Sequence, residues 1–220
     1  MSFSKESKEI YDCEKYISKL AFVVLEYLKT HALLDQSVAI LDYGCGNGDV
    51  AKFLSQKLNY TLFTCIDISQ KAIDSARKNC ENLLNFEFLC GDVSAINQPY
   101  DIILLSGVYH FLNKKQRSAL ISKIKRFLNP GGLLFLLTLS TNDQQYYGKG
   151  KPITDIDDPN SFIYDEGYYL HFSSKKELQT QFNFLKEERL DEFYGKNYTK
   201  DKEFFTCWIF TGKKPLNAVM

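Results

Sequence analysis

The amino-acid sequence predicts an α/β fold: a doubly wound, mostly parallel sheet with helices on both faces. The first observation is that five short apolar runs alternate with amphipathic stretches between residues 38 and 138. The second is that these runs are apolar at almost every position, which is typical of strands that are covered on two sides. The third is a glycine-rich turn that joins the first run to the amphipathic stretch after it.

The predicted strands follow one another through the first two thirds of the chain. We expect them at 38–43, 60–66, 86–90, 100–105 and 133–138. Apolar residues at helical spacing predict helices near 11–30, 50–58 and 70–79, and a fourth helix between the last two strands. Ser69 is expected to cap the third helix. Asn129-Pro-Gly-Gly132 is expected to end the fourth helix and to turn the chain.

The last third of the chain has a different pattern. Residues 140–160 are polar, rich in Gly, Asp, Asn and Pro, and without a sustained period, so we expect a long loop there. Ser174 and Glu177 have the spacing of a capping box, which predicts a short helix through Phe182. Two further strands at 184–193 and 203–211, separated by a polar turn, predict a closing antiparallel hairpin.

Composition limits the classes of protein and partner. The 27 basic side chains balance the 27 acidic ones, which argues against a nucleic-acid partner. The longest apolar runs, 133–137 and 102–105, are far shorter than the roughly 20 residues that cross a bilayer. The first nine residues are polar and contain acids, so we expect no membrane partner and a cytoplasmic protein. The six cysteines have no CxxC spacing, which predicts neither disulfides nor a metal site.

The turn after the first strand reads Leu41-Asp-Tyr-Gly-Cys-Gly-Asn-Gly-Asp49. Glycines at alternate positions between a strand and a helix let the backbone turn sharply and approach a ligand closely. A dinucleotide site has the spacing GxGxxG, so that a pyrophosphate rests on the helix N-terminus. Here Asp49 stands at the sixth position, and Asp42 precedes the glycines. The two acids favour a positively charged cofactor without phosphate.

Two more acids end the second and third predicted strands. Asp67 stands where a carboxylate can take both hydroxyls of a ribose, and Asp92 stands where an acid can accept from an adenine amino group. Considered alone, Asp67 could instead be a helix cap, and Asp92 could instead be an ordinary turn residue. Acids at the ends of three consecutive strands, beside a glycine turn, predict a nucleoside cofactor at the carboxyl edge of the sheet.

In these residues, and in Asp101-Ile-Ile-Leu-Leu-Ser106 and Leu128-Asn-Pro-Gly-Gly132, the sequence resembles the class I S-adenosylmethionine-dependent methyltransferases. The resemblance implies a seven-stranded sheet with an antiparallel last strand, and S-adenosyl-L-methionine as the cofactor. The cofactor-binding residues that it implies are Asp42, Gly44, Cys45, Gly46, Gly48, Asp67, Ile68, Asp92, Val93 and Ser106. The glycines would line the methionine half, Asp67 would hold the ribose, and Ile68 and Val93 would flank the adenine.

The resemblance also implies how the chain is organised. We expect one methyltransferase domain over 1–220. Its parts are a helical cover (1–35), a cofactor-binding core (36–139), a variable substrate-side insertion (140–172) and a closing helix and hairpin (173–213). Tyr11 and Tyr16 lie in the cover, which folds over the cofactor in relatives.

The residues of the transfer step itself are marked less clearly. Tyr109 and His110 follow the fourth strand, near the expected acceptor, and are the catalytic candidates; the alternative for His110 is packing against the next helix. The substrate-side candidates are Tyr16, Tyr168, Tyr169 and His171. The aromatic residues between 146 and 172 are either a lid over a small, partly apolar acceptor or ordinary core at the sheet edge.

These residues predict methyl transfer from S-adenosylmethionine to a small-molecule acceptor by in-line displacement. Relatives that methylate amino groups of adenine or glutamine have an Asn/Asp-Pro-Pro-aromatic motif after the fourth strand. This chain has Ser106-Gly-Val-Tyr109 there, so we do not expect those amino groups as acceptors. The alternatives are a protein or RNA methyltransferase and a catalytically silent, cofactor-binding regulatory subunit. Asp49 argues against a further alternative, a nicotinamide-dependent oxidoreductase. The sequence assigns neither the acceptor nor the oligomeric state.

Overall fold

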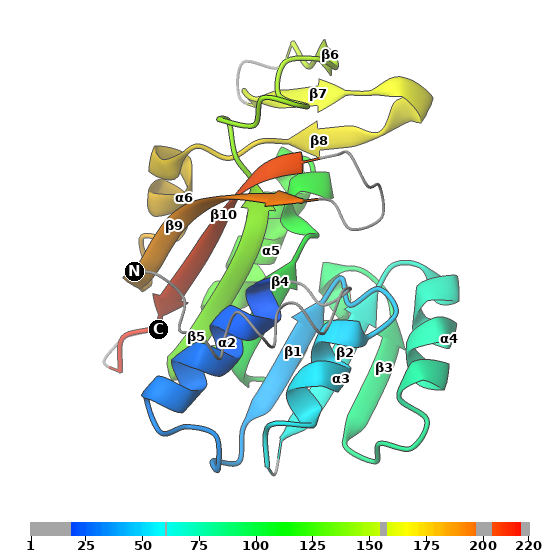
Figure 1. Cartoon of the computed structure of the whole chain (residues 1–220), viewed down its shortest axis with the longest axis vertical. Helices are drawn as coiled ribbons and strands as arrows, with labels where there is room; N and C mark the ends of the chain where they lie inside the picture. Colours follow the sequence, from blue (N-terminus) through cyan, green and yellow to red (C-terminus); the bar gives the residue numbers. More distant parts are fainter. Residues whose placement is uncertain (1–18, 60, 155–157, 197–203, 217–220) are drawn as a thin grey trace.

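The protein is seen in a computed structural model, which describes residues 19–59, 61–154, 158–196 and 204–216. Its centre is a seven-stranded sheet with the strand order β3-β2-β1-β4-β5-β10-β9 (Figure 1). The strands are β1 (Ala39–Tyr43), β2 (Leu62–Asp67), β3 (Phe86–Cys90), β4 (Tyr100–Ser106), β5 (Leu128–Leu139), β9 (Lys186–Lys196) and β10 (Phe204–Lys213). Strands β1 to β5 are parallel, and β10 is antiparallel to both β5 and β9. The predicted fold class, with its closing antiparallel hairpin, is confirmed.

Helices cover both faces of the sheet. The bounds are α2 (Lys19–Thr30), α3 (Asp49–Ser55), α4 (Gln70–Asn79), α5 (Lys114–Phe127) and α6 (Lys175–Gln181). Along β5, Leu133, Phe135 and Leu137 join the core beneath α2 and α3, whereas Leu134 and Leu136 join the core beneath α5 and α6 (Figure 1). Because both faces are buried, the strand needs apolar residues at successive positions. That requirement explains the apolar runs from which the fold is predicted.

The ends of the helices follow from local sequence. The hydroxyl of Ser69 accepts a hydrogen bond from the backbone N–H of Ala72 and caps α4, as predicted. At the start of α5 the side chain of Asn113 accepts from the backbone N–H of Gln116, and the side chain of Gln116 accepts from the backbone N–H of Asn113. This capping box was not identified in the sequence analysis. The predicted N-terminal helix is described only from Lys19 onward, so Tyr11 and Tyr16 lie outside the described residues.

The segment Asn129-Pro-Gly-Gly132 differs from the expectation. It ends α5, but it lies within β5 as a bulge instead of forming a separate turn before the strand. Leu128 already pairs with Tyr100, and Leu133 pairs with Ile102, so the four residues between them stand opposite a single residue of β4. Gly131 has φ 79° and donates its backbone N–H to the carbonyl of Lys214, which fixes the bulge against the end of β10.

The segment after β5 lies across the carboxyl edge of the sheet, at the top of Figure 1. It contains β6 (Lys151–Pro152), β7 (Ser161–Ile163) and β8 (Tyr169–His171), which form a three-stranded antiparallel sheet. We call this the insertion sheet. The expectation of a structureless loop over 140–160 is therefore wrong at β6. Strands of two and three residues are too short to show a period in the sequence.

The helix after the insertion sheet begins at the predicted cap. The hydroxyl of Ser174 accepts from the backbone N–H of Glu177, but the Glu177 carboxylate does not return to Ser174. It binds the side chains of His171 and Gln181 instead.

In the part of the chain that the structure describes, no helix has the length and apolar character needed to cross a membrane.

Candidate cofactor and acceptor site

The glycine turn lies between β1 and α3 at the carboxyl edge of the sheet. Gly44, Gly46 and Gly48 have φ values of 77°, 56° and 80°, a region that glycine adopts without steric cost. A Cβ on Gly44 would come within 2.6 Å of Val108, whereas a Cβ on Gly46 would meet nothing within 4 Å. The turn is therefore packed against the chain at Gly44 and open to a ligand at Gly46.

Asp67, at the end of β2, fixes the turn from the neighbouring strand. Its Oδ2 accepts from the backbone N–H of Gly46 at 2.9 Å, and its Oδ1 accepts from the backbone N–H of Ser69 at 2.9 Å. Each carboxylate oxygen has a second lone pair. The side chain is thus held in one orientation and still offers two acceptors, which suits a pair of ribose hydroxyls.

A cavity opens beside Asp67 between the ends of β2, β3 and β4. It is lined by Tyr43, Gly44, Ile66, Asp67, Ile68, Gly91, Asp92, Val93, Val108, Leu112 and Gln116. Ile68 is 76% exposed and lines the cavity, so its side chain is available to pack on the face of an aromatic base. Asp92 caps η1 (Val93–Ala95), and its hydrogen bonds with Ser94 hold the pKa of its carboxyl below the usual value. It is therefore both a helix cap and an ionised acceptor at the cavity.

Asp42 is the most unusual side chain of the site. It is 1% exposed, and neither carboxylate oxygen has a hydrogen-bond partner. Burial, together with the nearby charge of Asp67, raises the pKa of Asp42 to about 7. A buried acid without a partner is costly, so a cationic ligand that reaches it would gain an unusually strong partner.

Two other predicted cofactor residues, Cys45 and Ser106, do not line the cavity, and Asp49 stands at the start of the helix that follows the turn. Cys45 is buried within the turn, close to Cys65 on β2, and a hydrogen bond between the two thiols, with burial, raises the pKa of Cys65. Ser106 is the last residue of β4 and is partly buried. Asp49, in the first turn of α3, accepts from the side chains of Asn47 and Asn79. Its carboxylate occupies the helix start where a dinucleotide site would hold pyrophosphate.

Comparisons with known proteins agree with this geometry. Residues 40–132, which contain the glycine turn and the acids, match a family described as a methyltransferase domain. A solved S-adenosylmethionine-dependent methyltransferase from Methanosarcina mazei has the same fold, with a TM-score of 0.71, 22% identity, and coverage of 86% of this chain and 98% of that one. The chain thus has a methyltransferase-domain match over these residues, and its fold is that of S-adenosylmethionine-dependent methyltransferases. Structures with this fold have been solved with S-adenosylhomocysteine or S-adenosylmethionine bound, and S-adenosyl-L-methionine is the cofactor that the sequence predicts here.

Curated relatives have several different acceptors. The malonyl-[acyl-carrier protein] O-methyltransferase of Halalkalibacterium halodurans is 28% identical over 145 residues, which cover 62% of this chain and 52% of that protein. A tRNA N(3)-cytidine methyltransferase of Gallus gallus is 28% identical over 189 residues, 79% of this chain and 50% of that protein. The chain thus spans about half the length of these relatives. A structure of a 1,6-didemethyltoxoflavin-N1-methyltransferase from Burkholderia thailandensis has a TM-score of 0.67 at 12% identity, covering 96% of this chain and 83% of that one.

The described residues fit S-adenosylmethionine. The unpaired carboxylate of Asp42 suits a cationic methionine end, and the open side of Gly46 leaves room for a ligand against the backbone. The two anchored oxygens of Asp67 suit the ribose hydroxyls. Five of the predicted cofactor residues line this cavity: Gly44, Asp67, Ile68, Asp92 and Val93. Of the lining residues that were not predicted, Val108, Leu112 and Gln116 come from the end of β4 to the start of α5, a segment that folds back over the cavity. The Asn113-Gln116 capping box was the one sequence signal for that fold-back.

The catalytic candidates after β4 lie in different surroundings. Tyr109 is fully buried and donates its hydroxyl to Gln181, and burial raises its pKa. Its ring belongs to the buried core beneath α5 and α6. His110 is 8% exposed, its Nδ1 has no partner, and burial, with the charge of His171, lowers its pKa to about 3. The structure therefore separates the two candidates and leaves only His110 with an unused polar atom.

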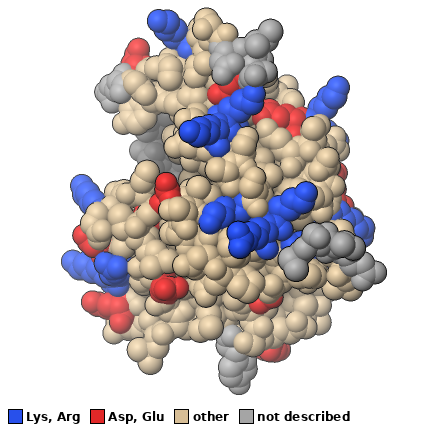
Figure 2. Space-filling view, turned by 180° about the vertical axis from the view of Figure 1, so that it is seen from behind, with Lys and Arg blue, Asp and Glu red and all other residues tan. Residues whose placement is uncertain are grey.

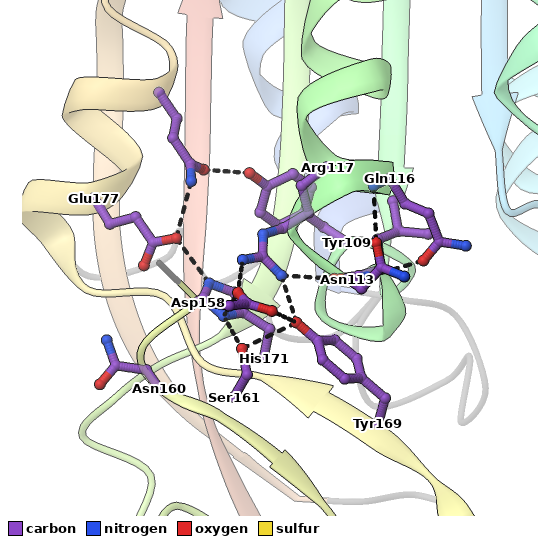
Figure 3. A network of polar contacts seen from close by, with 12 residues as sticks. Tyr109, Asn113, Gln116, Arg117, Asp158, Asn160, Ser161, Tyr169, His171 and Glu177 are labelled. Atoms are coloured by element: carbon purple, nitrogen blue, oxygen red, sulfur yellow. Dashed lines mark hydrogen bonds and ion pairs between the residues drawn. The ribbon is translucent and has the colours of Figure 1, made fainter. Parts of the chain in front are cut away.

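The substrate-side candidates Tyr169 and His171 belong to a buried polar network between α5, the insertion sheet and α6 (Figure 3). Arg117 and Asp158 form an ion pair with side chains only 4% and 6% exposed, and the hydroxyl of Tyr169 contacts both. His171 bonds Ser161 through Nδ1 and Glu177 through Nε2, at 2.9 and 2.8 Å. Both ring nitrogens are thus used. No local sequence pattern predicts this network, because its ion pair joins residues 41 positions apart.

The aromatic residues of the insertion pack mainly on one another. Tyr147 meets Phe162 and Phe172 edge to face, with ring centroids 5.4 and 5.5 Å apart, and Phe162 contacts Tyr164 in the same way. These rings form the core beneath the insertion sheet, the second of the two expected interpretations. Tyr168 is 58% exposed and stands apart from that core, while Tyr16 lies outside the described residues.

Proposed function

We propose that this protein transfers a methyl group from S-adenosylmethionine to a small-molecule acceptor. Asp42 is the observation that carries the proposal, because a buried and unpaired carboxylate beside an open glycine turn calls for a cationic ligand. The cofactor supplies an activated methyl group when it is bound. The chain therefore has to orient it, balance its charge and exclude water, and it needs no strong base for an acceptor that already has a free lone pair.

Each part of the site has a role in this proposal. Gly44 to Gly48 line the methionine half, and Asp42 balances its positive charge. Asp67 holds the ribose, Ile68 and Val93 enclose the adenine, and Asp92 accepts from its amino group. Ser106 contacts the amino-acid end. The nucleophile then approaches from the side of the insertion sheet, which lies across the carboxyl edge (Figure 1).

The proposal is one methyltransferase domain that works in the cytoplasm, and two features support a small acceptor. The insertion sheet is anchored to α5 and α6 by buried contacts, so it would form a fixed wall on the acceptor side. Among the relatives, the coclaurine and didemethyltoxoflavin enzymes are named for small molecules. Tyr168, which is exposed on the insertion, is the described substrate-side candidate with a free ring face.

An RNA acceptor is the second candidate, and a specific surface favours it. Apart from the buried Arg117, helix α5 has five basic residues and no acidic one. Figure 2, which views the molecule from behind, shows Lys and Arg side chains gathered on that face. Phosphate backbones bind such surfaces in a salt-dependent way. A filter-binding titration with mixed tRNA at two salt concentrations separates the candidates, since a small-molecule enzyme should show only weak, non-specific retention.

Calorimetric titration tests the cofactor half of the proposal. We expect S-adenosylmethionine and S-adenosylhomocysteine to bind the wild-type protein, and NAD⁺ to show no heat. Asp42→Asn should weaken both sulfur ligands at least tenfold, since a charge-assisted contact contributes about 1.5–3 kcal/mol. Asp74→Asn on the exposed face of α4 is the matched control and should bind normally.

A turnover assay tests the second half of the proposal, methyl transfer to a small-molecule acceptor. Incubation with S-adenosylmethionine and a panel of small hydroxyl, amine and thiol acceptors should release S-adenosylhomocysteine with at least one of them. Cofactor binding without turnover on such a panel, on RNA or on protein would favour the silent regulatory subunit. Wild-type protein that binds neither sulfur ligand would overturn the proposed function itself.

A further inference from the structure

Three ionisable side chains in the described part of the chain leave a buried polar atom without a partner: Asp42, His110 and Arg117. Arg117 uses its other nitrogens for Asp158, Tyr169 and a backbone carbonyl. Asp42 lies at the end of β1, and His110 follows the end of β4, the strand next to β1 in the sheet. The two remaining unpaired groups therefore belong to neighbouring strand ends at the same edge.

The position of His110 places it on the acceptor side of the cofactor turn. It lies two residues after Val108, whose side chain packs on Gly44 of the turn. Its short helix η2 (Tyr109–Phe111) also packs against β8 of the insertion sheet. His110 thus lies between the glycine turn and the insertion that covers the edge.

The neighbours of His110 do not satisfy its Nδ1. The ring packs on Phe111 with centroids 4.3 Å apart, and His171 is the nearest titratable group to affect it. His171 cannot be the partner, because both of its nitrogens are bonded to Ser161 and Glu177. An unmet buried hydrogen-bonding group costs about 1–3 kcal/mol, and a ligand that meets it recovers that cost.

We propose that His110 hydrogen-bonds the methyl acceptor and selects one with a neutral polar group, such as a hydroxyl, next to the methylated atom. This inference rests on the proposed function. The imidazole is uncharged in these surroundings, so it offers one hydrogen bond and no ion pair, and a hydroxyl can either donate or accept. His110 acts as an acceptor-binding residue. His171 and Glu177 act as positioning residues, because they hold β8 against it.

Three substitutions test the inference with an acceptor found in the turnover panel. His110→Phe removes both nitrogens and keeps a ring, His110→Leu does so without added bulk, and His110→Asn keeps a polar group near the position of Nδ1. We expect Phe and Leu to raise KM for the acceptor about tenfold or more, with Kd for S-adenosylhomocysteine unchanged. Asn should restore part of the loss. His31→Gln, on an exposed ring near the end of α2, is the control.

Stability of the ligand-free protein supplies a second measurement. If Nδ1 of His110 stays unpaired until the methyl acceptor binds, His110→Leu should unfold at the same or a higher urea concentration than the wild type. If a bound water satisfies it instead, Leu and Phe should destabilise the protein, Asn should restore stability, and acceptor KM should not change; that result overturns the inference. Wild-type protein without turnover would overturn the proposed function, whereas wild-type turnover with an unchanged acceptor KM in His110→Phe would overturn this inference alone.

Discussion

The carboxylate of Asp67 accepts a hydrogen bond from the backbone N–H of Gly46, with 2.9 Å between Oδ2 and the nitrogen. This contact joins the end of β2 to the open side of the glycine turn at the end of β1. It explains how one carboxylate orients the turn and still faces the ligand cavity. In the proposed function, the geometry of the turn and the binding of the cofactor would therefore be coupled through a single side chain.

Replacement of Asp67 should therefore affect both the geometry of the glycine turn and the affinity for the cofactor. Asp67→Ala removes two charge-assisted hydrogen bonds to backbone N–H groups as well as the ribose acceptors, so we expect Kd for S-adenosylhomocysteine to rise about 100-fold or more. Asp67→Asn keeps one acceptor and should lose less. Isothermal calorimetry gives both values, and equal affinity for wild type and Asp67→Ala would contradict the assignment.

The glycine turn allows a matched pair of substitutions. A Cβ on Gly46 meets open space, so Gly46→Ala should cost only about 1 kcal/mol of stability for its positive φ and should mainly lower cofactor affinity. A Cβ on Gly44 would lie 2.6 Å from Val108, so Gly44→Ala should lower stability by more than Gly46→Ala does. Urea unfolding and calorimetry on both variants measure the contrast. An unfolding midpoint lower for Gly46→Ala than for Gly44→Ala would count against it.

These contrasts show how far the sequence determines the site. The acids and glycines of the cofactor turn lie at strand ends, and strands buried on both faces have a clear apolar pattern, so both were predictable. The insertion sheet was not, because its strands have two or three residues each. The pairing of Arg117 with Asp158 depends on how distant segments pack, and no local rule contains it. The glycines of the β5 bulge indicated a turn, and pairing with β4 and β10 turned them into part of a strand.

The ionisation of Asp42 should be visible in the pH dependence of stability. The ordinary pKa of its carboxyl is 3.8, and burial, then the charge of Asp67, raises it to about 7 in the folded protein. Between these values the folded protein binds the proton more tightly, so this group lowers the free energy of unfolding as pH rises from about 4 to 7. The loss reaches up to about 4 kcal/mol above pH 7, at 1.36 kcal/mol for each pKa unit.

Asp42→Asn should remove this loss. The difference in free energy of unfolding between Asp42→Asn and the wild type should be larger at pH 8 than at pH 5, because only the wild type develops a buried charge. Urea titrations at the two pH values measure it. A cationic cofactor should also lower the pKa of Asp42, so binding at pH 6.5 should release a proton, seen as a binding enthalpy that varies with the buffer. If the difference in free energy of unfolding between Asp42→Asn and the wild type is the same at both pH values, the pKa of Asp42 is not raised.

The ion pair of Arg117 and Asp158 should hold the insertion sheet in place (Figure 3). Breaking a buried pair leaves an uncompensated charge and costs about 3–5 kcal/mol, so Arg117→Gln or Asp158→Asn should loosen the insertion sheet around Tyr169 and His171. We expect faster amide hydrogen exchange over 158–173 and a higher KM for the acceptor. Because neither residue lines the cofactor cavity, Kd for S-adenosylhomocysteine should stay within about twofold of the wild-type value. Replacing both partners with Met and Leu removes the charges together and should be milder than either single change. Exchange that speeds up equally at the glycine turn and in the insertion would show instead that the pair stabilises the whole fold.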